Sequence, residues 1–304
     1  MTFANRADLV AALDKANYLV DEGLATALFL AQSIAQPLLL EGEPGVGKTT
    51  AAKAMATVLG GPLIRLQCYE GISAAEALYE WNYSRQLLAI RLAEASHEAV
   101  ASTDLFTPDY LLDRPLLRAA RHPGPEPAVL LIDEIDRADD EFEALLFEFL
   151  GEQSVSVPEL GTFQAIVDPV VVLTSNRSRE LHDALRRRCL YHWIDFPSAQ
   201  RAAEIVRRNV PAAAEPLVTA ATAFVGKARD LDFDKPPGVA EIIDWVGALH
   251  ALGITDLDAD STRSTLSAVI KTPDDVRRAA EAIESNELTI EPTPEESSGA
   301  TTDD

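Results

Sequence analysis

The sequence predicts an α/β protein in which a doubly wound parallel sheet is followed by an all-helical region. Two observations support this prediction. Up to residue 197, apolar strand-like runs alternate with segments whose apolar residues recur at helical spacing, a pattern typical of parallel sheets flanked by helices. After Pro197 the strand signal disappears, and the Ala-rich sequence is helical in pattern to about residue 286.

Each element follows from its own local pattern. The run 128–132 is continuously apolar, as is typical of a strand buried on both faces. The predicted strands are 37–40, 63–67, 128–132, 169–174 and 190–196, and a hairpin is predicted within 154–168. The predicted helices include 6–16, 21–35, one ending before Gly60-Gly61-Pro62, 139–151, 179–187, 239–251, and a last one with Thr272 as N-cap and Pro273 at its first position.

We therefore expect three regions. Residues 1–197 form the α/β domain, in which the segment 68–126 is long for a crossover and becomes irregular in its second half. Residues 198–286 form a small helical domain. Residues 287–304 are acidic, contain no Lys or Arg, and are expected to be disordered.

Composition narrows the class of protein. The chain has 304 residues and a formal net charge of −23, which disfavours nucleic acid as a partner. The two cysteines lie far apart and show no ligand spacing, so we expect a reducing compartment. The five histidines show no metal-ligand spacing either, and we interpret them as surface or ordinary structural residues. The first residues lack the apolar core of a signal peptide, and no window is apolar enough to span a membrane. We expect a cytoplasmic protein.

A phosphate-binding loop is predicted between the first strand and the following helix. The match to G-x-x-x-x-G-K-[ST] consists of Gly42, Glu43, Pro44, Gly45, Val46, Gly47, Lys48 and Thr49, with Thr50 next in the helix. Such a loop surrounds a polyphosphate with backbone N–H groups at a helix N-terminus; Lys48 would reach the β- and γ-phosphates, and Thr49 would coordinate Mg²⁺. The alternative is a Gly-rich turn that carries Lys-Thr by chance.

Polar residues follow two further strands. Asp133 and Glu134 come after 128–132, and Asn176 follows 169–174. At the carboxyl edge of the sheet, Asp133 would hold Mg²⁺, Glu134 would polarise an attacking water, and Asn176 would orient that water or touch the γ-phosphate. The alternatives are an acidic helix start for the two acids and an ordinary strand-end residue for Asn176.

The densest basic cluster is Arg186-Arg187-Arg188. It is open to three interpretations: favourable placement at a helix C-terminus, a solvated run of charge, or an arginine finger that enters a neighbouring subunit's nucleotide site. Arg188 is the first candidate for the finger and Arg187 the second.

Together these motifs resemble the P-loop ATPases of the AAA+ class, and most closely its MoxR branch. The resemblance is carried by GEPGVGKT, LLIDEID, the hairpin 154–168, TSN at 174–176 and ALRRRCLYHWIDFP at 184–197, and it covers residues 17–284. Within the branch, the stretches 68–88, 137–150 and 184–197 are similar to CoxD-type accessory ATPases of carbon monoxide dehydrogenase maturation.

The resemblance implies a hexameric ring with Mg·ATP between subunits and Arg188 or Arg187 completing the neighbour's site. It implies that the helical domain is a lid, and that a helix-two insert near 68–90 and the hairpin face the substrate. A von Willebrand factor A domain protein and a metalloenzyme client would be partners. AAA+ lids usually place an arginine on the nucleotide, but helix 239–251 has none. Either Lys235 replaces it, another residue does, or the lid senses the nucleotide in a different way. Gln67 either restrains Glu134 or is an ordinary strand-end residue.

Three other classes of function also use a phosphate-binding loop. A nucleic-acid motor or clamp loader is the main alternative, and the charge of −23 counts against it. A GTP switch would need the guanine-reading motif N-K-x-D, which the chain lacks. A small-molecule kinase would use the same loop, but the Asp-Glu pair and the arginine cluster suit attack by water in an oligomer better.

Overall fold

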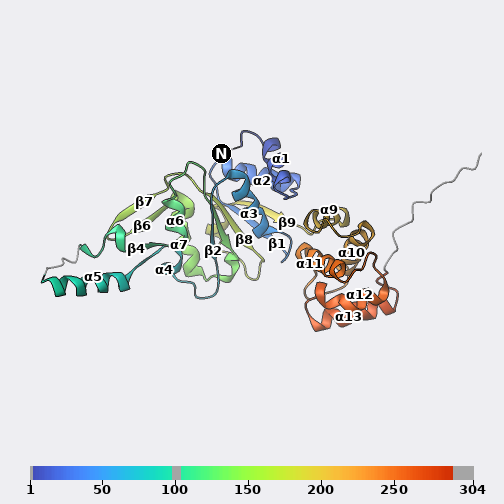
Figure 1. Cartoon of the computed structure of the whole chain (residues 1–304). Helices are drawn as coiled ribbons and strands as arrows, with labels where there is room; N and C mark the ends of the chain where they lie inside the picture. Colours follow the sequence, from blue (N-terminus) through green and yellow to red (C-terminus); the bar gives the residue numbers. More distant parts are fainter. Residues whose placement is uncertain (1–2, 98–103, 290–304) are drawn as a thin grey trace, which may run out of the picture. The chain divides into compact units, whose positions relative to one another are not determined.

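The computed structural model of the protein describes residues 3–97 and 104–289 (Figure 1). Their contacts divide the chain into two compact units. The first comprises the residues up to Gly42 and Lys48–Ile194, and the second comprises Glu43–Gly47 and the residues from Asp195 onward. The predicted acidic tail lies outside the described residues from residue 290. Among the helices that are described, none has the length and apolar character needed to cross a bilayer.

A five-stranded sheet in the order β2-β5-β8-β1-β9 forms the centre of the first unit (Figure 1). All its neighbouring strands are parallel, which confirms the predicted fold class. Every residue of β5 and β8 is buried, as expected of strands covered on both faces. The strands are β1 (Leu38–Gly42), β2 (Leu63–Gln67), β5 (Val129–Asp133), β8 (Val170–Ser175) and β9 (Leu190–Ile194).

Helices cover this sheet on both faces. Helices α2 and α3 contact its strands from one side, while Leu39, Leu130 and Leu173 share a core with residues of α6 and α7 on the other. Helix α7 buries Phe142, Leu146, Phe149 and Leu150, whereas Leu145 is 37% exposed. The helices are α1 (Arg6–Lys15), α2 (Glu22–Ser33), α3 (Lys48–Leu59), α6 (Pro115–Ala120) and α7 (Asp140–Glu152).

The long segment between β2 and β5 contains elements that periodicity did not predict. It holds α4 (Ala74–Ala77), β3 (Tyr79–Trp81), α5 (Tyr83–Ser96), the 3-10 turn η2 (Pro108–Tyr110) and β4 (Leu111–Asp113). β3 and β4 pair antiparallel in a separate two-stranded sheet. Strands of three residues are too short to show a period, and the ring of Trp81 packs edge-on against Phe106 at 5.1 Å, a contact between distant residues that local sequence does not encode.

The hairpin is confirmed as β6 (Ser154–Val157) and β7 (Gly161–Gln164), but the helix predicted over 179–187 is wrong in length. It is only the single turn α8 (Asp183–Arg186). Ser178 donates from its backbone N to Asp136 Oδ2 at 2.9 Å, and Arg179 donates from Nε to the Ala138 carbonyl at 2.9 Å. These tertiary hydrogen bonds hold the residues before α8 in a non-helical path.

The second unit is helical, as predicted. Its core is built around Phe224 and Trp245, whose rings lie 5.4 Å apart. Thr272 caps α13 as predicted, accepting from the N–H of Asp275. Leu288 is buried in this core, so the unit extends beyond residue 286, where we expected it to end. Its helices are α9 (Ala199–Asn209), α10 (Glu215–Ala228), α11 (Val239–Ala251), α12 (Ala259–Val269) and α13 (Pro273–Glu284).

Candidate active site

The predicted phosphate-binding loop connects β1 to α3, and its backbone has the form that the motif requires. Gly45 and Gly47 have φ values of 79° and 100°, a region that residues with a Cβ rarely adopt. Lys48 opens α3 and is 7% exposed, and its Nζ donates to the Gly42 carbonyl at 2.6 Å. In the same stretch Val46 is buried, whereas Glu43, Pro44 and Thr50 are exposed.

The two predicted magnesium ligands lie together. Asp133 ends β5 and is 2% exposed. Thr49 Oγ1 donates to Asp133 Oδ1 at 3.0 Å, and Thr174 Oγ1 donates to the same oxygen at 2.6 Å. Magnesium prefers oxygen ligands and usually binds one or two protein groups together with phosphate oxygens, so Thr49 and Asp133 fit this ion. No cluster of three or more Asp, Glu, His or Cys suited to a metal occurs in the described ranges.

Strand β2 holds both acids through two residues. Arg65 donates from Nε to Asp133 Oδ2 at 2.9 Å and also hydrogen-bonds Gln67. Gln67 donates from Nε2 to Glu134 Oε2 at 3.2 Å, the contact that the first of our two interpretations of Gln67 requires. Sequence reasoning missed Arg65 and Thr174. The available signal was the i, i+2 spacing of Arg65 and Gln67, which places both side chains on one face of β2.

Glu134 has a backbone conformation that positions its side chain. Its φ and ψ are 56° and 50°, which is uncommon for a residue with a Cβ and is often found at functional sites. The Glu134 N–H donates to Thr174 Oγ1 at 2.9 Å. The side chain is 33% exposed, with Arg137 Nη1 at 3.2 Å from Oε2. Water therefore has access to this carboxylate, as a water-polarising role requires.

The surroundings of these acids are electronegative. The thiol of Cys68 follows β2 and is buried. Burial, with added contributions from the charges of Asp133, Asp136 and Glu134, raises the pKa of Cys68 to about 12. The same negative field favours a divalent cation at this edge of the sheet.

The remaining predicted catalytic residues are Asn176, which follows the central strand β8, and Arg187 and Arg188, which follow α8. Asn176 directly follows β8 and is half-buried, and Arg187 is exposed. Arg188 donates from Nη1 to the Ala184 carbonyl at 3.1 Å, and its guanidinium carbon lies 4.9 Å from the centre of the Phe147 ring. These contacts hold the Arg188 side chain against α8 and α7.

Within the second unit, the start of α11 contacts the phosphate-binding loop. Val239 donates from its backbone N to the Gly45 carbonyl at 3.1 Å. Glu241 Oε2 accepts from the N–H of Gly238 at 3.0 Å. A Cβ added at Gly238 would lie 2.7 Å from Gly45 Cα and 2.9 Å from its carbonyl carbon, so only glycine permits this approach of two backbones.

We expect Gly238→Ala to weaken ATP binding about tenfold, because overpacking at the Gly45 backbone costs about 1–3 kcal/mol. Isothermal titration calorimetry with Mg·ATP measures the effect. Gly247→Ala on the same helix is the matched control, since a Cβ there meets no atom within 4 Å. Equal ATP affinity of the two variants would show that the contact between Gly238 and Gly45 does not matter for binding.

The segment before α11 is held by an arginine that sequence reasoning did not single out. Arg229 donates from Nε to the Pro237 carbonyl at 2.8 Å, and its guanidinium lies 4.1 Å from the centre of the Phe196 ring. Burial lowers the pKa of Arg229 to about 10, against the opposing charge of Glu241. Lys235, which we considered as the replacement for the usual lid arginine, is exposed.

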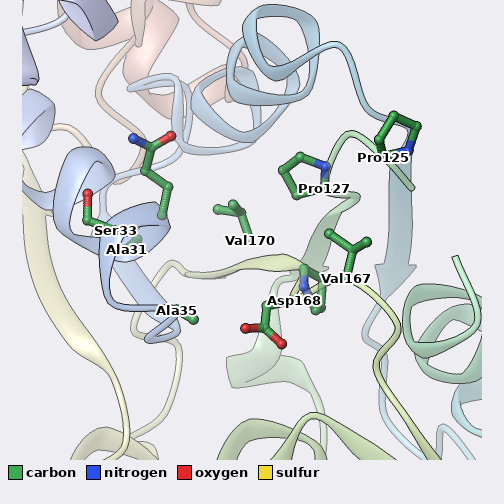
Figure 2. A pocket seen from close by; sticks show the side chains of 10 residues that line it. Ala31, Ser33, Ala35, Pro125, Pro127, Val167, Asp168 and Val170 are labelled. Carbon is green, nitrogen blue, oxygen red and sulfur yellow. The ribbon is translucent and has the colours of Figure 1, made fainter. Parts of the chain in front are cut away.

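A pocket also lies at the opposite edge of the sheet. It is lined by Ala35, Pro127 and Pro169, which precede β1, β5 and β8, together with Gln32 and Asp168 (Figure 2). Because it lies at the amino ends of the strands, it contains none of the predicted site residues.

Comparison with known proteins agrees with this geometry. The family model described as AAA domain (dynein-related subfamily) matches residues 37–189. NorQ of Paracoccus denitrificans (strain Pd 1222) is 27% identical over 180 residues, which cover 57% of this chain and 57% of NorQ. MoxR of Paracoccus denitrificans is 29% identical over 119 residues, which cover 39% of this chain and 28% of MoxR. The chain thus matches about half of one relative's length and less of the other's.

Solved structures with a similar fold include RuvB of Thermotoga maritima, described as a Holliday junction branch migration motor. It has a TM-score of 0.44 and 19% identity, covering 84% of this chain and 67% of RuvB. A variant of the same protein has a TM-score of 0.46 and 18% identity, covering 87% of this chain and 70% of RuvB. From the family match, the chain belongs to the AAA-domain family, in its dynein-related subfamily.

Proposed function

We propose that this protein hydrolyses Mg·ATP in a ring of identical subunits and uses the turnover to remodel a client protein, a metalloenzyme during its maturation. The observation that carries the proposal is the meeting of Thr49 with Asp133, beside Glu134 and Lys48, where β1 and β5 end. Phosphoryl transfer to water needs a phosphate-binding loop, a cation site and a carboxylate that polarises water, and these residues supply all three.

Each residue has a defined role in this proposal. Lys48 binds the β- and γ-phosphates, and Thr49 and Asp133 hold Mg²⁺, which neutralises developing charge on the phosphate oxygens. Glu134 takes a proton from the attacking water, and Asn176 orients that water or the γ-phosphate. The Gln67 amide fixes the Glu134 carboxylate at 3.2 Å. Arg188 of one subunit, with Arg187 as the alternative, stabilises charge in the next subunit's site.

Lys48→Ala tests whether the loop binds nucleotide. Removing this buried ammonium should raise the Kd for Mg·ATP about ten- to a hundredfold, as expected for loss of hydrogen bonds to charged groups. Titration of wild type and variant with ATP and with GTP measures the effect, and wild type should prefer ATP. Equal retention of ATP by the variant would overturn the proposed function.

The insert and the hairpin are proposed to face the client or a von Willebrand factor A domain partner. Support comes from α5, which extends away from the five-stranded sheet (Figure 1) and exposes four large apolar side chains. These are Tyr83, Leu87, Leu88 and Leu92, each between 53% and 66% exposed. Exposed apolar side chains gathered on one element are characteristic of protein-binding surfaces.

The CoxD-like stretches suggest a client related to carbon monoxide dehydrogenase. The two free thiols suit a location in the reducing cytoplasm.

A double substitution, Leu88→Ser with Leu92→Ser, should leave basal ATPase activity unchanged and greatly reduce the partners captured from the native host. Capture is best done in a Glu134→Gln background, in which we expect slow hydrolysis to prolong the ATP-bound state. Leu252→Ser, at an apolar side chain that is 66% exposed in the second unit, is the matched control. If the double variant and the control capture the same partners, α5 is not the partner-binding element.

A further inference from the structure

A buried carboxylate that the proposed chemistry does not use lies one residue before the phosphate-binding loop. Glu41 is on β1, and its side chain is 2% exposed. In the strand register it lies beside Ser175 of β8 and Trp193 of β9. It therefore belongs to the same face of the sheet as Leu39, two residues earlier. Burial of a charged carboxylate destabilises the fold unless a cation or a hydrogen-bond donor pairs with it, so we expect such partners beside Glu41.

Two arginines from two different segments approach Glu41. Arg177, the residue after Asn176, places Nε 3.8 Å from Glu41 Oε2. Arg186 of α8 places an Nη atom 3.7 Å from the same oxygen. Both separations are in the range of ion pairs and too long for hydrogen bonds, and in the described part of the chain Oε2 has no hydrogen-bond partner. One buried oxygen is thus shared by two cations.

Strand β9 places an aromatic ring beneath each of these arginines. The guanidinium of Arg186 lies 5.5 Å from the centre of the Tyr191 ring, and that of Arg177 lies 5.8 Å from the centre of the Trp193 ring. The pKa of Tyr191 is raised, first by burial and second by the negative charge of Glu41. The Tyr191 hydroxyl therefore lies near the Glu41 carboxylate. We name these five residues the Glu41 cluster: Glu41, Arg177, Arg186, Tyr191 and Trp193. Ring and carboxylate together orient each guanidinium.

We propose that Glu41 is a positioning residue that aligns the arginine finger with the subunit's own phosphate-binding loop. The Glu41 cluster joins the strand that leads into the loop, the residue that follows Asn176, and the turn that carries the finger. Arg186 and Arg188 are two residues apart on that turn, so fixing Arg186 also sets the direction of Arg188. This inference rests on the proposed function, because it requires Arg188 to act in the site of a neighbouring subunit.

Mixed rings separate this role from a local effect on the loop. A Glu134→Gln subunit supplies Arg188 but does not hydrolyse ATP, whereas an Arg188→Ala subunit hydrolyses only beside such a donor. Random mixing in a head-to-tail ring gives roughly one productive interface in four. Glu41→Gln is then added either to the donor or to the acceptor subunit, and steady-state ATPase activity is measured in each mixture.

We expect Glu41→Gln in the donor to lower the rescued activity about tenfold, because displacement of a catalytic group by about 1 Å can cost up to about 100-fold. In the acceptor, Glu41→Gln should lower the rescued activity less than about twofold. In uniform rings, Glu41→Gln should lower kcat about tenfold and leave the KM for ATP unchanged. Arg186→Met in the donor, which keeps contact with the ring of Tyr191 but removes the charge, should reproduce the donor defect. Glu284→Gln, at an exposed site on α13, is the control.

Full rescue by the Glu41→Gln and Arg186→Met donors would overturn the inference. Equal losses in donor and acceptor would also overturn it, since they would indicate a structural role in both subunits. If the parent mixture of Glu134→Gln and Arg188→Ala subunits shows no activity although each binds ATP, action of Arg188 between subunits is itself refuted. The failure of the proposed function is thereby distinguished from failure of the role of Glu41.

Discussion

Glu134→Gln is expected to lower ATP hydrolysis by a factor of about 100 to 10,000, the usual contribution of a general base, while ATP remains bound. Glutamine keeps the size of the side chain and can still meet the Gln67 amide, which lies 3.2 Å from Glu134 Oε2. It cannot accept a proton from water. The loss should therefore appear in kcat, with little change in the Kd for Mg·ATP.

Single-turnover hydrolysis and equilibrium binding of labelled ATP measure the two quantities separately. Glu284→Gln makes the same chemical change at an exposed position in the second unit and should behave as wild type. Hydrolysis by Glu134→Gln at the wild-type rate would remove Glu134 from the mechanism. Loss of ATP binding would instead indicate that the substitution disturbs the left-handed turn at this residue.

The sheet was predictable because its strands are continuous apolar runs and its loop is a fixed motif. The same holds for α11, whose apolar residues recur at helical spacing, and for α13, whose start carries the local signals Thr272 and Pro273. The pair β3 and β4 was not predictable, since strands of three residues stabilised by distant contacts leave no period. The predicted length of α8 was wrong for a related reason. Hydrogen bonds from Ser178 to Asp136 and from Arg179 to the Ala138 carbonyl hold this segment outside the helix.

The site shows the same division. Motif spacing was enough to predict that Lys48, Thr49, Asp133 and Glu134 lie at one edge, because parallel strands end on the same side of a sheet. The residues that orient these groups or the arginine cluster belong to no motif. Arg65 and Glu41 resemble ordinary strand residues in the sequence. Only the pairing of β2 with β5 brings Arg65 to Asp133, and only the pairing of β1 with β8 brings Glu41 close to Arg177.

Arg188→Ala is expected to lower hydrolysis about 1,000-fold, in the range found for arginine fingers, without loss of ATP binding. The three consecutive arginines lie in different environments, which suggests how they differ in role. Arg186 is engaged by Glu41 of its own subunit. Arg187 and Arg188 are both exposed, but Arg188 also contacts the Phe147 ring and the Ala184 carbonyl, which orient its guanidinium. An oriented guanidinium loses less conformational freedom when it enters a neighbour's site, and this favours Arg188 over Arg187.

Comparison of Arg188→Ala with Arg187→Ala decides between them, since each removes one guanidinium from the same turn. If Arg188 acts in the site of a neighbouring subunit, Arg188→Ala subunits that are inactive alone should regain activity when they are mixed with Glu134→Gln subunits. A residue that acts only in its own site would not allow this recovery. Wild-type turnover by uniform Arg188→Ala rings would exclude Arg188, and a large loss confined to Arg187→Ala would transfer the role to its neighbour. Because an arginine that completes a neighbouring site is useful only in an assembly, recovery in the mixture would at the same time be direct evidence that the subunits associate head to tail.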